Sequence, residues 1–208
     1  MRGVITIDNT GANLRVKLSP DNKRLAYNYD RALWTVSALG GAPIKLLDRF
    51  ASGFTWSPDS RWIAFAEGGK LFKISSQGGA EPILVAESED RTFDGTAWIG
   101  DSIYAPAGAD VMRVSAAGGK PVKVASPRPV AISGYSADGR TLYVFENVEG
   151  SRPRVLPIDI ASGAIGKAID LDTDGAVDSV SVHSSGKRFA ALVRLSTYNL
   201  YTLEGFAK

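Results

Sequence analysis

The chain has 208 residues, 44% of them hydrophobic and 22% charged, so it can bury a sizeable core and has an ordinary globular composition. Its 24 basic and 22 acidic residues leave a formal net charge of +2, and no basic run stands out, which argues against nucleic-acid binding. It holds no cysteine and one histidine, which excludes disulfides, thiolate metal sites and a multi-histidine metal centre. No apolar stretch approaches the ~20 residues that span a bilayer. We therefore expect no membrane span, no bound metal and no cofactor.

A pattern of four strand-like runs recurs along the chain. It is clearest between Phe54 and Val85, where Ser57-Pro58-Asp59 separates the first run from the second and Gly78-Gly79 separates the third from the fourth. Both motifs suit tight turns, because an Asp side chain bonds nearby backbone amides and Gly adopts positive φ without strain. Each unit is therefore predicted to be a four-stranded antiparallel meander.

Five units match this template with a spacing of about 40 residues, which is the signature of a repeat architecture. The first turn recurs, in degenerate form in the later units, at residues 19–21, 57–59, 99–101, 136–139 and 183–186. The third run recurs at residues 33–37, 71–75, 111–115, 155–159 and 200–204. Fourth runs follow at residues 43–47, 82–86, 121–125 and 166–171.

A single sheet of this kind has two apolar faces and two edges, and radial packing of several such sheets buries the faces. We therefore predict an all-β fold with a single domain, residues 1–208, that is a β-propeller of about five four-stranded antiparallel blades. The expected blades are roughly residues 9–49, 50–90, 91–128, 129–174, and 175–208 plus 1–8. We interpret the apolar side chains of the inner strands as wedges between blades, and the alternative is that their aromatics bind a ligand. These inner-strand positions are residues 16/18, 54/56, 96/98, 133/135 and 180/182.

The last unit has no fourth run after residues 200–204, whereas residues 3–7 form an unassigned strand near the N-terminus. We predict that this N-terminal strand completes the last blade and closes the ring. The alternative is that residues 3–7 are the remnant of a lost blade in a longer propeller. Self-association through an open edge is then possible.

Little in the sequence points to catalysis, and no catalytic residue is predicted. There is no Gly-x-Ser-x-Gly motif, which rules out the usual strand–turn–helix nucleophile. His183 stands where the first two units carry the turn serine. We therefore interpret it as a turn histidine, in preference to a Ser–His–Asp arrangement with Ser184 or Ser185.

Candidate ligand-binding residues come from the position four residues before each inner-strand aromatic, which we expect near the mouth of the central channel. Asp94, Asp178 and Ser52 occupy this position in three units. Two carboxylates facing one channel can hold a cation or a polar ligand through their oxygens, or act as an acid/base pair. The alternative is that they bond local backbone amides where the strands begin.

Candidate interface residues are the arginines expected in loops of the later blades. Arg91, Arg128 and Arg152 belong to this group. Arginine is enriched at protein interfaces because it pairs a planar charge with apolar contact area. The alternative is that these side chains are only solvated.

At Trp56-Ser57-Pro58-Asp59-Ser60 and Gly78-Gly79 the chain resembles the WD-like repeats of TolB-type β-propellers, and the resemblance covers nearly the whole sequence. The ending at residues 199–206 looks like the ends of propeller domains appended to bacterial signalling proteins. The resemblance implies a bacterial protein with a periplasmic or extracellular location.

We expect a non-catalytic propeller that acts as a rigid scaffold for a protein or peptide partner. One alternative is a sensor or accessory propeller domain cut from a larger signalling protein or peptidase. A third reading is a hydrolase with Asp94 and Asp178 in the channel.

Overall fold

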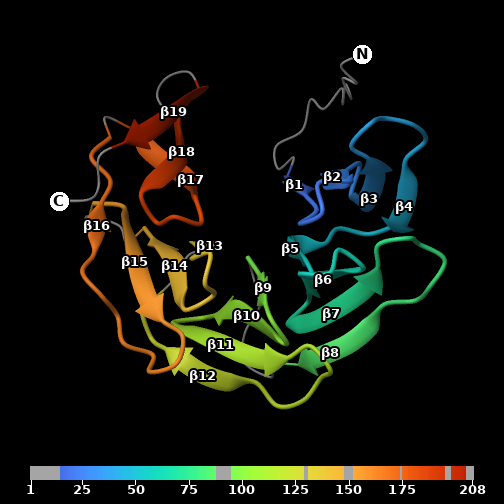
Figure 1. The fold of residues 1–208 in the computed structure, drawn as a ribbon, viewed down its shortest axis with the longest axis horizontal. Helices are drawn as coiled ribbons and strands as arrows, with labels where there is room; N and C mark the ends of the chain where they lie inside the picture. Colours follow the sequence, from blue (N-terminus) through green and yellow to red (C-terminus); the bar gives the residue numbers. More distant parts are fainter. Residues whose placement is uncertain are drawn as a thin grey trace. The chain divides into compact units, whose positions relative to one another are not determined.

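The computed structural model describes residues 15–87, 95–128, 131–147, 152–173, 175–194 and 198–204. Every regular element in these ranges is a β-strand, and the strands form five antiparallel sheets (Figure 1). None of the described residues forms a helix long and apolar enough to cross a bilayer. The chain divides into two compact units, Met1–Ile103 with Val114–Lys120, and Tyr104–Arg113 with Pro121–Lys208.

Within each sheet the strands pair in chain order, as a meander requires. Sheet 1 contains β1 (Val16–Leu18), β2 (Arg24–Tyr29), β3 (Ala32–Ser37) and β4 (Ile44–Leu47). Sheet 2 contains β5 (Ser52–Trp56), β6 (Trp62–Glu67), β7 (Lys70–Ser75) and β8 (Ile83–Glu87). Sheet 3 contains β9 (Ala97–Ile99), β10 (Ser102–Ala107), β11 (Asp110–Ser115) and β12 (Val122–Ala125). Sheet 4 contains β13 (Ala131–Tyr135), β14 (Thr141–Glu146), β15 (Arg154–Asp159) and β16 (Ile169–Asp170). Sheet 5 contains β17 (Ala176–Val182), β18 (Arg188–Arg194) and β19 (Tyr198–Glu204).

The predicted turn chemistry is confirmed between the first and second strands. Asn22 and Ser60 adopt φ of 60° and 61°, the left-handed region that these turns require. Between the third and fourth strands, paired glycines provide the reversal, and Pro43, Pro82 and Pro121 immediately precede the fourth strands β4, β8 and β12. A proline fits there because its missing N–H removes no hydrogen bond from the ladder.

The turn between the third and fourth strands of a sheet also touches the outer strand of the sheet before it. The Gly119 N–H donates to the carbonyl oxygen of Val85, on β8, at 3.2 Å. A Cβ added at Gly163 would lie 2.1 Å from the carbonyl oxygen of Val124, on β12. Glycine is required at residue 163 for this close approach as well as for its φ of 73°.

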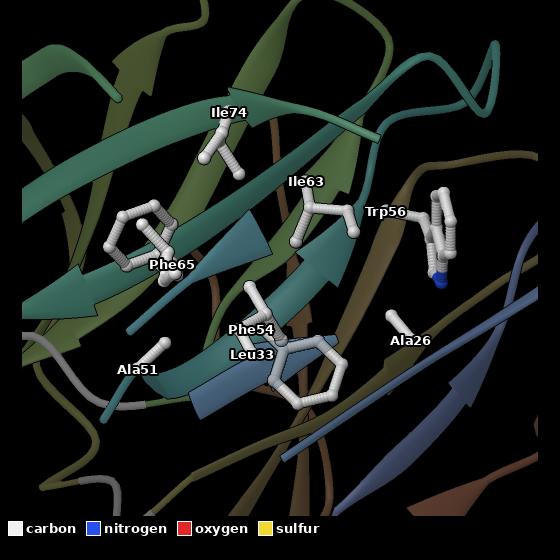
Figure 2. Close-up of a cluster of buried hydrophobic side chains, with 9 residues drawn as sticks. Ala26, Leu33, Ala51, Phe54, Trp56, Ile63, Phe65 and Ile74 are labelled. Carbon is white, nitrogen blue, oxygen red and sulfur yellow. The ribbon is translucent and has the colours of Figure 1, made fainter. Parts of the chain in front are cut away.

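Neighbouring sheets pack through apolar faces within each unit. In the first unit a buried cluster joins sheets 1 and 2, and Leu33, Phe54 and Phe65 in it are fully buried (Figure 2). In the second unit Phe145 and Phe189 belong to a similar cluster between sheets 4 and 5. Each fully buried side chain of this size contributes roughly 1.5–3 kcal/mol of transfer free energy, so these inter-sheet cores stabilise the repeat array.

The wedge interpretation holds for sheets 2 and 3 and differs in sheet 1. Phe54 is fully buried, and Trp56 and Trp98 are each 5% exposed. Val16 and Leu18, at the matching positions of β1, are each 48% exposed. They lie on the face of sheet 1 opposite to the one that packs on sheet 2. Lys17, between them, pairs with Ala26 of the shared core, and neighbouring residues of a strand point to opposite faces.

The predicted closure of the last blade by residues 3–7 lies outside the described residues. Sheet 5 has three described strands, in agreement with the absence of a fourth run after β19 in the sequence. The blade boundaries and the single-domain organisation stay predictions.

Candidate binding groove

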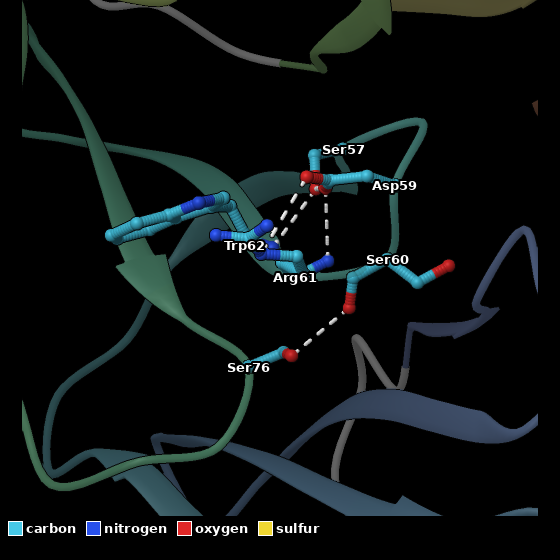
Figure 3. Close-up of polar contacts among 6 residues, drawn as sticks. All are labelled: Ser57, Asp59, Ser60, Arg61, Trp62 and Ser76. Atoms are coloured by element: carbon cyan, nitrogen blue, oxygen red, sulfur yellow. Dashed lines mark hydrogen bonds and ion pairs between the residues drawn. The ribbon is translucent and has the colours of Figure 1, made fainter.

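The Ser-x-Asp turn between the first two strands is a hydrogen-bonded module. In sheet 2 the Ser57 hydroxyl donates to Asp59 Oδ1 at 2.6 Å, and Ser57 Oγ accepts the N–H of Trp62 at 2.9 Å (Figure 3). The N–H of Arg61 donates to the same Asp59 oxygen at 3.1 Å. The Ser57 hydrogen bond is the largest of the effects that hold the pKa of the Asp59 carboxyl below its ordinary value of 3.8.

The same module recurs in sheets 1 and 4. The serine–aspartate distance is again 2.6 Å for Ser19–Asp21 and for Ser136–Asp138. The pKa of each aspartate is lowered for the same reason. These carboxylates are therefore a shared part of the turn, and a function specific to one junction has to be sought where the surroundings of the copies differ.

At the junction of sheets 1 and 2, side chains of the two sheets bridge the space between their turns, and we call this the closed junction. The Arg24 guanidinium donates to the Ser76 carbonyl and to Gln77 Oε1, both at 2.7 Å. The turn of sheet 2 also reaches across, since Ser60 Oγ accepts the Asp21 N–H at 3.1 Å. The Ser76 hydroxyl donates to the Ser60 carbonyl at 3.0 Å, which holds the two turns of sheet 2 together (Figure 3).

At the junction of sheets 2 and 3 the corresponding turn of sheet 3 is shorter. Five residues, 57–61, separate Trp56 from Trp62 in sheet 2, whereas three residues, 99–101, separate Trp98 from Ser102 in sheet 3. The turns still match at their ends: the Arg61 carbonyl accepts the Ser76 N–H at 2.9 Å, and the Asp101 carbonyl accepts the Ala116 N–H at 2.8 Å. The residue that corresponds to Ser60 is therefore missing.

The next two positions are also smaller in sheet 3. Ala116 and Ala117 follow β11 where Ser76 and Gln77 follow β7. The side chains of Ser60 and Gln77 thus have no counterpart of similar size at the second junction, and Trp62 stands there in the position of Arg24. A groove of about 470 Å³ remains, lined among others by Trp62, Lys73 and Asp101. We call this space the groove; its other lining residues are Ser57, Pro58, Asp59, Trp98, Gly100, Ala116 and Ala117.

The ammonium of Lys73, which lines the groove, is held in place by two contacts. It donates to the Ala116 carbonyl at 2.7 Å and lies 5.3 Å from the centre of the Trp62 ring. The first contact reproduces what Arg24 does at the other junction. The second is a cation–π contact that fixes the half-buried indole of Trp62.

Two groups of the groove have no partner among the residues that the structure describes. The indole N–H of Trp62 has no acceptor there, and the exposed carboxylate of Asp101 has neither a donor nor a cation. Trp98, in contrast, donates its indole N–H to the Gly100 carbonyl at 3.1 Å and is 5% exposed. The groove therefore offers a free donor, a free carboxylate and an aromatic surface.

The predicted channel residues are only partly described. Asp94 lies outside the described residues, and Ser52 is described by its backbone, paired with Ala66 in β5. Asp178 is exposed and occupies the β-bulge between Val177 and Ser179 in β17. Ser52 and Asp178 belong to different compact units, and their grouping with Asp94 stays a prediction.

The predicted interface arginines likewise stay predictions. Arg91 lies outside the described residues. Arg128 is exposed, with φ of 54°, and its N–H donates to the Ala109 carbonyl at 3.0 Å. Arg152 is exposed and lies 3.6 Å from the exposed carboxylate of Asp172, a contact that contributes little to stability in water.

His183 forms the turn of sheet 5 in the way predicted. Its Nδ1 lies 2.9 Å from the Ser185 hydroxyl and accepts the Ser185 N–H at 3.2 Å. The Ser185 hydroxyl in turn accepts the Lys187 N–H at 3.3 Å, as Asp59 accepts that of Arg61 in sheet 2. The pair is thus a variant of the turn module, on the exposed surface.

Known structures support the fold. No family model matches the sequence, and no curated protein matches it. The β-propeller domain of Swd1 (Cps50) from Myceliophteria thermophila superposes with a TM-score of 0.66 at 17% identity, over 91% of this chain and 65% of that one. The chain is a β-propeller. This confirms the all-β propeller fold predicted from the repeats.

The likeness extends to TolB and to an enzyme. A putative TolB from Agrobacterium tumefaciens gives a TM-score of 0.68 at 18% identity, over 92% of the propeller and 76% of that chain. Hydrazine synthase from Kuenenia stuttgartiensis gives 0.67 at 18% identity, over 92% of the propeller and 59% of that chain. The propeller thus spans less than two thirds of the hydrazine synthase and Swd1 chains. Likeness at this identity concerns the fold, so the resemblance to TolB-type propellers is confirmed at that level.

The groove itself was not predicted. The signals were present: the shortened turn at Ile99-Gly100-Asp101, and two alanines before Gly118-Gly119. In the sequence, the short turn and the two alanines look like ordinary variation between repeats. Only the contacts across the junction of sheets 1 and 2 show that the larger side chains at the equivalent positions fill space there.

Proposed function

We propose that this propeller is a non-catalytic scaffold that binds a protein or peptide partner in the groove between sheets 2 and 3. One observation carries the proposal: side chains bridge the turns at the junction of sheets 1 and 2, whereas the equivalent space between sheets 2 and 3 is open. The open copy is lined by a partly exposed tryptophan and by an unpartnered carboxylate. Aromatic surface beside a few polar groups is the usual chemistry of peptide-binding grooves.

The described residues contain no group of three or more His, Asp or Glu side chains that could hold a metal ion. The histidine–serine pair at residues 183 and 185 is accounted for by the turn. The alternative of a hydrolase built on Asp94 and Asp178 stays a prediction, because Asp94 lies outside the described residues.

A bacterial, periplasmic scaffold role is part of the same proposal, and it follows only from the resemblance of the repeats at residues 56–60 and 78–79 to those of TolB-type propellers. The accessory-domain reading is compatible with it, because a propeller attached to a larger protein would still bind through its own groove.

The test is a peptide selection with matched groove variants. A phage-displayed dodecapeptide library is selected on the full chain, and binders are measured by fluorescence anisotropy. Ala117→Trp fills the groove at an exposed position, and Gln77→Trp makes the same change at the equivalent exposed position of the closed junction. We expect Ala117→Trp to weaken selected peptides by at least about tenfold, equivalent to about 1.4 kcal/mol, and Gln77→Trp to leave their affinity unchanged.

Equal melting temperatures of the two variants establish that both remain folded. Peptides bound equally well by Ala117→Trp, or a selection that yields no binder, would overturn the proposal.

A further inference from the structure

Resting on the proposed function, we propose that the groove recognises a cationic side chain, in the first place arginine, carried by an extended segment of the partner.

The rim charge changes between the two junctions. At the closed junction the turn of sheet 2 brings Arg61 alongside Ser60, which accepts the Asp21 N–H. At the open junction the residue that corresponds to Arg61 is Asp101, because both carbonyls accept the N–H of the residue after the third strand. Asp59 and Asp101 thus line the same groove, and a basic residue has been replaced by an acidic one. A cation is the complement of such a rim, whereas an anion would be repelled.

The contact between Arg61 and Asp59 shows that a carboxylate of this groove already lies near a guanidinium group. Arg61 Nε lies 3.8 Å from Asp59 Oδ2, with side chains 77% and 53% exposed, so the pair is long and solvated. A pair of this kind contributes little to stability. A guanidinium of the partner can therefore replace Arg61 at small cost. Arginine suits the place better than lysine, because its planar fork contacts a carboxylate and an indole face together.

The basic residue inside the groove offsets only one of the two carboxylates that line it. Lys73 directs its ammonium to the Ala116 carbonyl and to the Trp62 ring, which are both uncharged. One acidic charge therefore remains in excess among the lining residues, and the Asp101 carboxylate has no partner among the described residues. The fixed Trp62 indole leaves its N–H unpaired, and a backbone carbonyl of the bound segment is the acceptor that it fits. The two free groups together select a peptide with a basic side chain.

The experiment follows the Trp62 indole N–H by nuclear magnetic resonance. The chain has four tryptophans, so four indole resonances are expected, and Trp62→Phe assigns the relevant one. The probes are three acetylated, amidated pentapeptides, Ala-Gly-Xaa-Gly-Ala, with arginine, citrulline or glutamate at the centre. Citrulline keeps the shape of arginine and removes its charge.

We expect the arginine peptide to shift the Trp62 resonance at millimolar concentration, and the citrulline and glutamate peptides to shift it weakly or not at all. Asp101→Asn is expected to weaken binding of the arginine peptide about threefold to fivefold, the upper part of the range of an exposed ion pair. Asp21→Asn, at the closed junction, is the matched control and should have no effect. Raising the salt from about 0.05 to 0.5 M should weaken binding because the Debye length shortens.

Equal shifts with arginine and citrulline, or an Asp101→Asn variant that binds like the wild type, would overturn this inference. The proposed function then still stands if the selected dodecapeptides lose affinity in Ala117→Trp. A sugar or an acidic peptide that shifts the Trp62 resonance more than the arginine peptide would likewise overturn the basic-peptide assignment.

Discussion

The close contact at Gly163 allows a quantitative test of how the sheets are joined. Gly163 and Gly79 have φ of 73° and 74°, so an alanine at either position pays the same left-handed backbone strain, roughly 1–2 kcal/mol. A Cβ at Gly79 meets nothing within 4 Å, whereas a Cβ at Gly163 lies 2.1 Å from the Val124 carbonyl oxygen. That oxygen belongs to the backbone of β12 and cannot rotate away, so we expect a further ~1–3 kcal/mol for Gly163→Ala, the usual cost of overpacking.

The assay is urea unfolding followed by tryptophan fluorescence, with thermal melts alongside. Gly163→Ala should unfold more easily than Gly79→Ala by about 2 kcal/mol, which corresponds to about 4–8 °C in melting temperature for a chain of 208 residues. If both variants lose the same stability, backbone strain alone matters and the contact with the outer strand contributes nothing.

Three further outcomes are expected. Ser57→Ala removes the main hydrogen bond that lowers the pKa of Asp59, so its carboxyl should titrate closer to 3.8 by carbon NMR. A lowered pKa contributes stability that is fully present above the unfolded-state value of 3.8 and is lost as the pH falls through the folded-state pKa. The variant should therefore lose less stability than the wild type when the pH is lowered through this range. The double change His183→Ser with Ser185→Asp rebuilds the module of sheet 2 and should raise stability by about 0.5 kcal/mol in urea unfolding. Deleting residues 1–8 should lower the melting temperature or cause association through an open edge.

Each of these outcomes has a clear opposite. An unchanged Asp59 titration in Ser57→Ala would contradict the role given to the hydroxyl, with Ser37→Ala, at an exposed site, as the control. A destabilised double variant at residues 183 and 185 would mean that the histidine turn has its own optimum. An unchanged melt and a monomeric profile after the deletion would rule out closure by the N-terminal strand.

Much of the fold was predictable because each unit repeats the same local chemistry. The strands after Pro43, Pro82 and Pro121 begin at the following residue, and third strands occur in all five expected places. A turn motif and an alternating strand are short-range features, so five copies reinforce one another.

The groove could not be predicted, since it depends on contacts between copies. Nothing in the residues around Ala117 indicates that its counterpart Gln77 bonds the Arg24 guanidinium of the preceding sheet. The search for function by aligned positions instead led to Asp94 and Asp178, which differ from their counterparts in charge. The groove instead depends on the smaller side chains at residues 116 and 117, compared with those at residues 76 and 77. A single sequence gives no indication that this difference in volume matters.

The contact between the glycine turn and the preceding outer strand bears on how this sequence can change. The groups approached on β8 and β12 are the carbonyl oxygens of Val85 and Val124. Every amino acid carries that oxygen, so at β8 and β12 these contacts do not depend on the side chain of the outer strand. At β4 the corresponding turn does meet a side chain, because a Cβ added at Gly78 would lie 2.8 Å from Ile44 Cγ2. Substitutions at residues 85 and 124 therefore leave the backbone contact between the sheets in place, whereas the size of residue 44 is tied to the glycine turn beside it.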